Sequence, residues 1–223
     1  MLGYLRALWG ALNTEALWYA LLRTGAVFLC LTVHESCHGL AALALGDPTA
    51  RDRHRLSLNP LRHIDWLGLA MMFAAGFGWA KPVPIDPRYF RHPKSGMALT
   101  ALAGPASNFV LAAAALYGVK LVLLYSPEAA WSAYLFLFLY MTARLSVGLG
   151  VFNLLPFPPL DGSKVAAAVL PDRLYVQWMR YEQFGMVILL AAVLLGWQAN
   201  IVGTAAEAVN GALYRLIAWI PPG

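Results

Sequence analysis

Charged side chains are scarce in this chain of 223 residues, because Asp, Glu, Lys and Arg together make up only 12% of it. A soluble domain usually carries about 25% charged residues. Hydrophobic residues make up 60%, and the mean hydropathy is +0.61. The composition therefore argues against an ordinary soluble protein and predicts an integral membrane protein, folded as one domain over residues 1–223.

Cysteine is nearly absent as well, and its two copies, Cys30 and Cys37, lie seven residues apart in one predicted helix. Their Cα atoms would be about 10 Å apart, which excludes a disulfide between them. The chain also lacks a Lys/Arg-rich arm and any alternation of basic and aromatic residues. The net charge of +5 therefore gives no sign of nucleic-acid binding and instead suits basic loops that face anionic lipid.

One polar motif interrupts the apolar run from Ala16 to Leu45. It contains His34, Glu35 and His38, a His-Glu-x-x-His pattern of which chance would supply about 0.002 copies in such a chain. On a helix the two histidines lie one turn apart on the same face and can bind one metal ion. Zn²⁺ would lower the pKa of a water there to about 7, and Glu35 is placed to take its proton. Two hydrogen-bonded buried histidines are the plain alternative, but ionisable residues inside a membrane are costly and usually functional.

Apolar segments predict the remaining helices. We expect an interfacial helix over residues 1–14 and a first transmembrane helix at about 16–45. Further spans are predicted at 97–125, 130–152 and 183–197, and residues 201–220 either cross the membrane again or lie along its surface. The predicted fold class is an all-α polytopic membrane protein with about five to six transmembrane helices and a short cytoplasmic-side β or re-entrant element.

The loop that follows the first predicted span is basic, with four arginines between residues 51 and 62. By the positive-inside rule this loop is cytoplasmic, so the histidine pair lies near the cytoplasmic end of its helix. Residues 53–58 alternate in a way that suits a short strand. Residues 66–80 are apolar but short, and the three prolines in 81–87 keep that segment extended. This segment is either an edge that pairs with a substrate strand or an ordinary loop.

Two more polar residues are predicted to reach the same end of the molecule. Asn108 follows Gly104-Pro105 inside a predicted span, where it either bonds a neighbouring helix or donates into an active cavity, or both. Asp161 follows a Pro-rich stretch, where it is either a third metal ligand with a fourth position left open or an ordinary turn residue. Arg144 lies inside a predicted span and should pair or face a cavity. His54, His63 and His92 lack motif spacing and are read as surface or hydrogen-bonding residues.

Three separated motifs, HESCHG at 34–39, GPASN at 104–108 and NLLPFPPLDG at 153–162, occur together with LNPLRHID and GWAKPVP. This ordered set resembles the site-2 protease family of intramembrane zinc metalloproteases, peptidase M50, in its compact bacterial branch without a PDZ domain. The resemblance covers about residues 16–165, the expected catalytic core. It departs from the family at Ser36 and Cys37, and at His54, where many relatives carry glycine.

The resemblance implies one Zn²⁺ per chain and hydrolysis of peptide bonds within or near transmembrane segments of membrane-protein substrates. It implies residence in the bilayer of a bacterial inner membrane, with the active site near the cytoplasmic side and with no nucleic-acid partner; it says nothing of the oligomeric state. The family pattern makes His34, His38 and Asp161 the zinc ligands, Glu35 the catalytic base, and Asn108 a second catalytic residue beside the reacting carbonyl. The expected substrate-binding residues are Lys81, Pro82, Val83, Pro84, Gly104 and Pro105.

Two other functions stay open at this point. One is a non-catalytic membrane protein of the same fold that binds client proteins, although binding alone has no need of a base such as Glu35. The other is a metal-ion transporter. A transporter predicts more acidic or histidine residues along the spans than the sequence provides.

Overall fold

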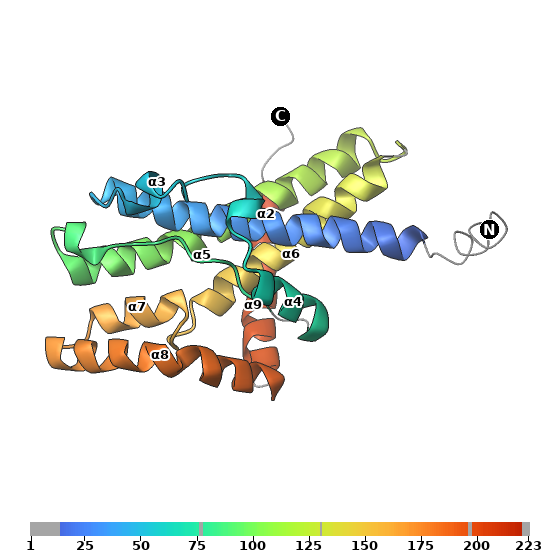
Figure 1. The fold of residues 1–223 in the computed structure, drawn as a ribbon. Helices are drawn as coiled ribbons and strands as arrows, with labels where there is room; N and C mark the ends of the chain where they lie inside the picture. The colour runs from blue at the N-terminus through green and yellow to red at the C-terminus, as the bar shows by residue number, and fades with distance from the viewer. Residues whose placement is uncertain (1–13, 76–77, 130, 196–197, 220–223) are drawn as a thin grey trace, which may run out of the picture.

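The computed structural model describes residues 14–75, 78–129, 131–195 and 198–219, and these residues are predominantly helical (Figure 1). The long helices are α2 (Thr14–Ala44), α5 (Pro93–Tyr125), α6 (Ser132–Asn153), α8 (Asp172–Leu194) and α9 (Gln198–Trp219). The short ones are α3 (Thr49–Asp52), η1 (Pro60–Arg62), α4 (Trp66–Ala75), η2 (Pro87–Tyr89) and α7 (Asp161–Ala168). The interfacial helix predicted over residues 1–14 lies, apart from its last residue, outside the described residues.

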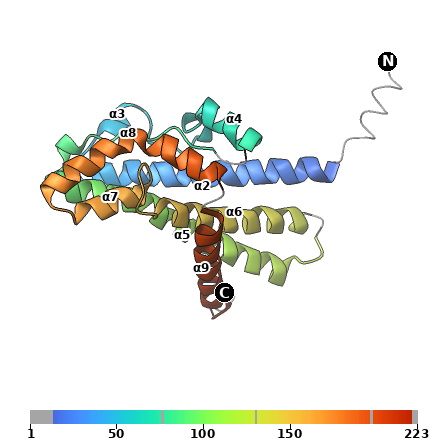
Figure 2. The same cartoon turned by 90° about the horizontal axis from the view of Figure 1, so that it is seen from below.

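Helix α5 forms the centre of the bundle, because it packs against α2, α6 and α7, while α2 also packs against α6. Helices α2, α5 and α6 run side by side, and α9 crosses them at a steep angle (Figures 1 and 2). The main apolar cluster joins α5, α6 and α9 and is rich in alanine, which lets the helix backbones approach closely, as is common in membrane proteins. Its buried members are Ala112, Ala115, Leu116, Ala143, Val147 and Ile217.

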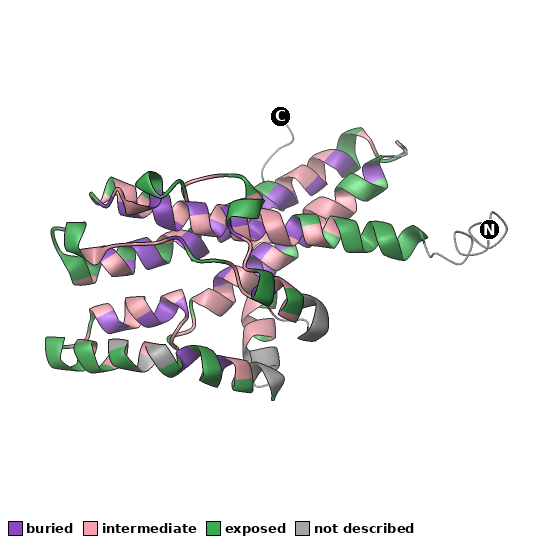
Figure 3. Cartoon of the chain, viewed as in Figure 1, coloured by how far each residue is buried: buried purple, intermediate pink, exposed green. Residues whose placement is uncertain are grey.

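Three helices, α2, α5 and α6, are long and apolar enough to cross a membrane. The N-terminal half of α2 exposes large apolar side chains, of which Leu17, Trp18 and Leu21 are each more than half exposed, whereas its C-terminal half is largely buried (Figure 3). A helix that shows so much continuous apolar surface is suited to lipid rather than to water. The chain is therefore a helical membrane protein.

The predicted count of five to six spans is not supported, since α2, α5 and α6 are the three qualifying helices among the described residues. Of the span predicted at 183–197, residues 183–194 form the C-terminal part of α8, and residues 196–197 lie outside the described residues. Arg180 and Glu182 come directly before this part, so the apolar stretch of α8 after them is too short to cross the membrane. In α9, Glu207 and Arg215 interrupt the apolar sequence in the same way. Both helices thus reach the length of a span without the necessary hydropathy.

The strand predicted over residues 53–58 is not formed, and the described part of the chain contains no strand; it has one isolated antiparallel bridge, between Ile64 and Ala80. The Ser57 carbonyl instead accepts hydrogen bonds from side chains, from Ser36 Oγ at 3.0 Å and from His63 Nε2 at 2.7 Å. His54 has a φ of +52°, in the left-handed region, where glycine would fit without strain.

Candidate metal centre

His34 and His38 lie in the buried C-terminal half of α2, with 4% and 6% of their surfaces exposed. Their spacing of one helical turn brings the two Nε2 atoms to 3.0 Å from each other, with the ring planes nearly perpendicular. His38 Nδ1 lies 2.7 Å from the carbonyl oxygen of Thr100 on α5. Because that carbonyl can only accept, Nδ1 carries the proton and the lone pair of His38 is on Nε2.

Asp161 comes from the start of α7, more than 120 residues along the chain, and its Oδ2 lies 3.1 Å from His34 Nε2 and 3.2 Å from His38 Nε2. The next residue, Gly162, is required for this placement, since a Cβ there would lie 2.2 Å from the Leu154 carbonyl oxygen. An aspartate side chain is ordinarily ionised near neutral pH, so Asp161 presents a carboxylate oxygen to the two imidazoles.

The three donor atoms form a triangle with sides of 3.0–3.2 Å and could together hold a metal ion. In a tetrahedral zinc site with bonds of about 2.0–2.1 Å, ligand atoms lie about 3.3 Å apart, so the spacing of these three donor atoms would suit a zinc ion. Asp161 Oδ2 is buried and receives no hydrogen bond from the described residues. Two imidazole lone pairs and a carboxylate facing one another repel unless a cation lies between them, so the donor set fits Zn²⁺.

Asn108 on α5 is completely buried, and its side-chain amide lies 3.3 Å from His34 Nδ1. The other amide atom, Oδ1, has no hydrogen-bond partner among the described residues. Rotating the amide by half a turn exchanges the two atoms and lets Oδ1 accept from His34 Nδ1–H, which leaves Nε2 free for the metal. Asn108 thus lies on the far side of the His34 ring from Nε2. Its predicted place beside the reacting carbonyl stays a prediction.

Gly104 on α5 lies directly against the two imidazole rings. A Cβ at this position would lie 2.4 Å from His38 Nε2 and 2.7 Å from His34 Cε1, so only glycine leaves the histidines where they are. Pro105, the next residue, is buried within α5. The structure therefore places Gly104 against the Nε2–Cε1 edge of His38 and against Cε1 of His34, and the predicted contact of Gly104 and Pro105 with substrate stays a prediction.

Glu35 is half-buried, and its Oε2 accepts a hydrogen bond of 2.9 Å from the backbone N–H of Val83. The predicted base and the Pro-rich segment therefore touch. Residues 81–84 are also held by the backbone N–H of Lys81, which donates to the His63 carbonyl at 2.9 Å, and by Arg55, which donates to the Lys81 carbonyl at 2.8 Å. The predicted substrate edge is thus placed beside Glu35, whereas its contact with substrate stays a prediction.

Three residues near the site were not found from the sequence. Thr100 contributes a backbone carbonyl, which leaves no side-chain signature. Ser146 on α6 donates to the carbonyl of Asn108 at 2.9 Å, and its only signal is a polar residue on an apolar helix. Asp47 is completely buried and accepts from the N–H of Asp86 at 2.7 Å, although Gly46-Asp47-Pro48 reads as a simple helix end.

Comparison with known proteins places this geometry in a family. The model of peptidase family M50 matches residues 120–196. The chain is 36% identical over 166 residues to YwhC of Bacillus subtilis, which covers 74% of this chain and 76% of that protein. It is 32% identical over 201 residues to Rip2 of Mycobacterium tuberculosis H37Rv, and this match covers 87% of this chain and 70% of that protein. Both relatives carry provisional names as zinc metalloproteases, and no solved structure matches the chain significantly. The chain belongs to peptidase family M50, the site-2 protease family.

Proposed function

We propose that this chain is a zinc-dependent protease that hydrolyses peptide bonds within or near transmembrane segments of membrane-protein substrates. The observation that carries the proposal is the triangle of His34 Nε2, His38 Nε2 and Asp161 Oδ2, with the carboxylate of Glu35 on the same helix. The family and the names of its relatives support a zinc metalloprotease. The apolar helices α2, α5 and α6 support an enzyme that works in the membrane.

The three donor atoms would hold one zinc ion and leave a fourth position open. A zinc ion there supplies Lewis-acid chemistry, since it lowers the pKa of a water to about 7 and polarises a peptide carbonyl. Asn108 and the Thr100 carbonyl fix the tautomers of the two histidines, so that both Nε2 lone pairs face the ion. In this role Asn108 positions a ligand, in addition to or in place of its predicted contact with the reacting carbonyl.

Glu35 acts as the base. One of its carboxylate oxygens accepts the N–H of Val83, which orients the group and leaves the other oxygen to take a proton from the attacking water. The same oxygen then returns the proton to the leaving amine when the peptide bond breaks. A substrate helix must unwind first, because its carbonyls are bonded internally.

The unwound strand passes beside residues 81–84. Proline supplies no N–H and the Val83 N–H is bound to Glu35, so pairing with the substrate would use carbonyl oxygens of this segment. We place the protein as a multi-pass protein of the bacterial inner membrane, with the metal centre near the cytoplasmic side. The basic loop between residues 51 and 62 and the clustered charges from Lys81 to Lys94 support this orientation.

The substitution Glu35→Gln tests the proposal in the full chain, reconstituted in lipid with a membrane-spanning reporter. We expect zinc content to be retained and cleavage to fall by about 10²- to 10⁴-fold, the usual contribution of a general base. The matched control is Glu15→Gln, in the exposed first turn of α2. Cleavage by Glu35→Gln at the wild-type rate would refute the mechanism. A client binder or a metal transporter, the two alternatives, predicts no cleavage that depends on Glu35.

A further inference from the structure

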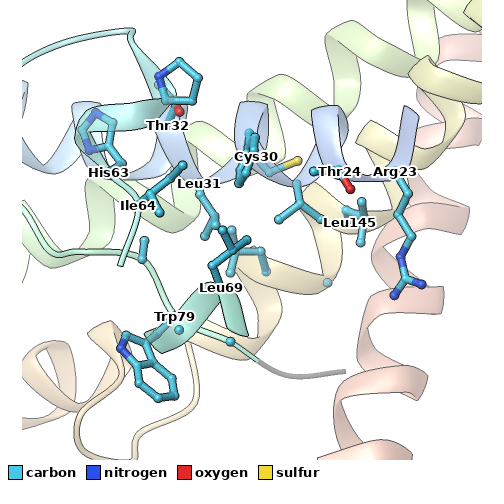
Figure 4. A pocket seen from close by; sticks show the side chains of 18 of the residues that line it. Arg23, Thr24, Cys30, Leu31, Thr32, His63, Ile64, Leu69, Trp79 and Leu145 are labelled. Atoms are coloured by element: carbon cyan, nitrogen blue, oxygen red, sulfur yellow. The ribbon is translucent and has the colours of Figure 1, made fainter. Parts of the chain in front are cut away.

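A cavity of about 710 Å³ lies between α2, α4 and α6, outside the metal centre (Figure 4). Its α2 wall includes Leu31, Cys30 and Val27, which lie three, four and seven residues before His34. This spacing puts them on the side of α2 that carries His34. The cavity therefore lies along α2 on the N-terminal side of the metal centre.

Two arginines from different helices line this cavity, Arg23 from α2 and Arg144 from α6. Both are exposed, and neither forms a hydrogen bond or an ion pair with any residue that the structure describes. In Figure 4, Arg23 lies at one end of the cavity and His63 lies at the other. Cationic side chains on membrane-spanning helices usually pair with an acid or mark a functional pathway. An anionic group is therefore the missing partner at the Arg23 end.

The depth of the arginines argues against a lipid headgroup as this anion. The rings of Trp18 and Tyr134 lie 5.9 Å apart, both half-exposed, and such aromatic pairs mark the membrane interface. Arg23 follows Trp18 by five residues and Arg144 follows Tyr134 by ten, so their Cα atoms lie about 7 and 15 Å deeper. That depth suits a side chain of a spanning segment better than a phosphate at the surface.

The opposite end of the cavity is lined by Thr32 and His63, which are 4% and 2% exposed. The one carboxylate among the described lining residues is Asp65, whose Oδ1 accepts from the backbone N–H groups of Leu67 and Gly68. The positive charge of the lining comes from Arg23 and Arg144. An acyl chain brings no charge to these arginines, whereas an acidic side chain of a spanning peptide does.

The distance between the arginine end and the metal centre fixes where an acidic residue would lie. From Arg23 to His34 is eleven residues of α2, or about 16 Å. A substrate must be unwound to reach the metal centre, and an extended chain covers this distance in about five residues.

We propose that this cavity binds the unwound part of a substrate's membrane span, and that Arg23 and Arg144 together bind an Asp or Glu side chain of that span. The acidic residue lies about five residues from the cleaved bond, on the side that points toward the N-terminus of α2. This inference rests on the proposed protease function and extends its site. It names the preferred substrates as spans that carry one acidic residue at that position.

The test uses a series of membrane-spanning reporters that carry Asp, or the isosteric Asn, at single positions about 2 to 12 residues from the cleaved bond. With the zinc-loaded full chain in vesicles of neutral lipid, we expect kcat/KM for Asp to exceed that for Asn about tenfold at positions 4 to 6, the low end for a hydrogen bond between charged groups. The double substitution of Arg23→Gln and Arg144→Gln removes this preference. Arg91→Gln, an exposed arginine outside the cavity, keeps it. The double substitution of Arg23→Glu and Arg144→Glu reverses the charge of this end of the cavity, so the preferred reporter then carries Lys in place of Asp.

Three results would overturn the inference. No preference for Asp at any position would remove the arginine contact, and a peak near position 11 would mean a helical occupant. An arginine effect that is equal for Asp and Asn reporters and appears only with anionic lipid would mean a lipid site. The proposed function is read separately, from cleavage of the Asn reporters by the wild type but not by Glu35→Gln.

Discussion

The metal centre and the Pro-rich segment at 81–86 are both held to α2, yet they are held in different ways. At the metal centre, the Nδ1 atoms of the two imidazoles contact groups of the central helix α5, the Thr100 carbonyl for His38 and the amide of Asn108 for His34. Most of the hydrogen bonds that hold the Pro-rich segment come from charged side chains, beside one backbone bond from Lys81 N–H to the His63 carbonyl. Glu35 and Asp47 accept its N–H groups, and Arg55 donates to its carbonyls.

This difference teaches that the ligand geometry is set by helix packing, whereas the position of the segment beside it depends on a few charge-assisted hydrogen bonds. Substitutions at the metal centre should therefore lower zinc affinity, and substitutions at the holding points of the segment should weaken substrate binding and leave zinc in place. Glu35 belongs to both regions, because its carboxylate binds Val83 next to the ligand pair.

The largest effect is expected for Asp161→Ala. Loss of even an outer partner of a ligand costs about 10- to 100-fold in metal affinity, so loss of a ligand should cost at least about 100-fold. Zinc content after dialysis against a graded chelator measures this. The control is Asp172→Ala, whose side chain is 96% exposed and forms only a long surface pair with Lys94. Unchanged zinc affinity in Asp161→Ala would remove Asp161 from the ligand set.

Gly104→Ala should come next, because the new methyl group would lie within 2.7 Å of both imidazoles and must displace at least one of them. We expect zinc affinity to fall by about 10- to 100-fold, as for a displaced ligand that is not lost. Gly203→Ala on α9 is the matched control, since its methyl group meets nothing within 4 Å. Equal zinc affinity in the two variants would mean that α5 yields and that the packing does not fix the ligands.

The sequence could predict the part of the site that is local. His34, Glu35 and His38 are recognisable because their geometry follows from one helix. Asp161 could be brought to them only by chain topology and family resemblance, since no spacing rule connects it to the histidines. The carbonyl of Thr100 could not be predicted at all, because any residue carries one.

For the fold as well, some elements could be predicted from the sequence and others could not. The apolar runs that form α2, α5 and α6 were located to within a few residues, because twenty consecutive apolar residues are a strong signal. The span count was wrong for the described residues, because α8 and α9 mix polar turns with apolar ones over a helix of sufficient length. The strand predicted over 53–58 was wrong, and side chains of Ser36, Arg62 and His63 donate to its carbonyls at Ser57 and His54. Arg144 was expected to pair or to face a cavity, and it lines one.

Asn108→Ala sharpens the comparison, because two roles for this residue predict different results. If Asn108 orients His34, zinc affinity falls about tenfold, the smallest loss usual when a hydrogen-bond partner of a metal ligand is removed. Activity then returns at high zinc concentration. If it stabilises the reacting oxyanion, zinc affinity stays constant and kcat falls by about 10²- to 10³-fold. The contact with His34 Nδ1 and the complete burial of the amide predict the first result. Ser107→Ala, one residue earlier on α5, is the control.

The smallest effect, and the most specific one, is expected for Asp47→Asn. Asp47 lies in the turn three residues after the end of α2 and is completely buried, and it accepts the N–H of Thr49 on one oxygen and the N–H of Asp86 on the other. An amide keeps one acceptor and turns an NH₂ group toward the second N–H, so the far end of the Pro-rich segment is released. We expect KM for a reporter to rise about three- to tenfold, the equivalent of one lost hydrogen bond, while zinc affinity stays unchanged. Asp52→Asn, exposed on α3, should change neither quantity. A fall in zinc affinity with a constant KM would mean that the position of the Pro-rich segment determines the ligand geometry. That result would contradict separate support of the segment and the metal centre.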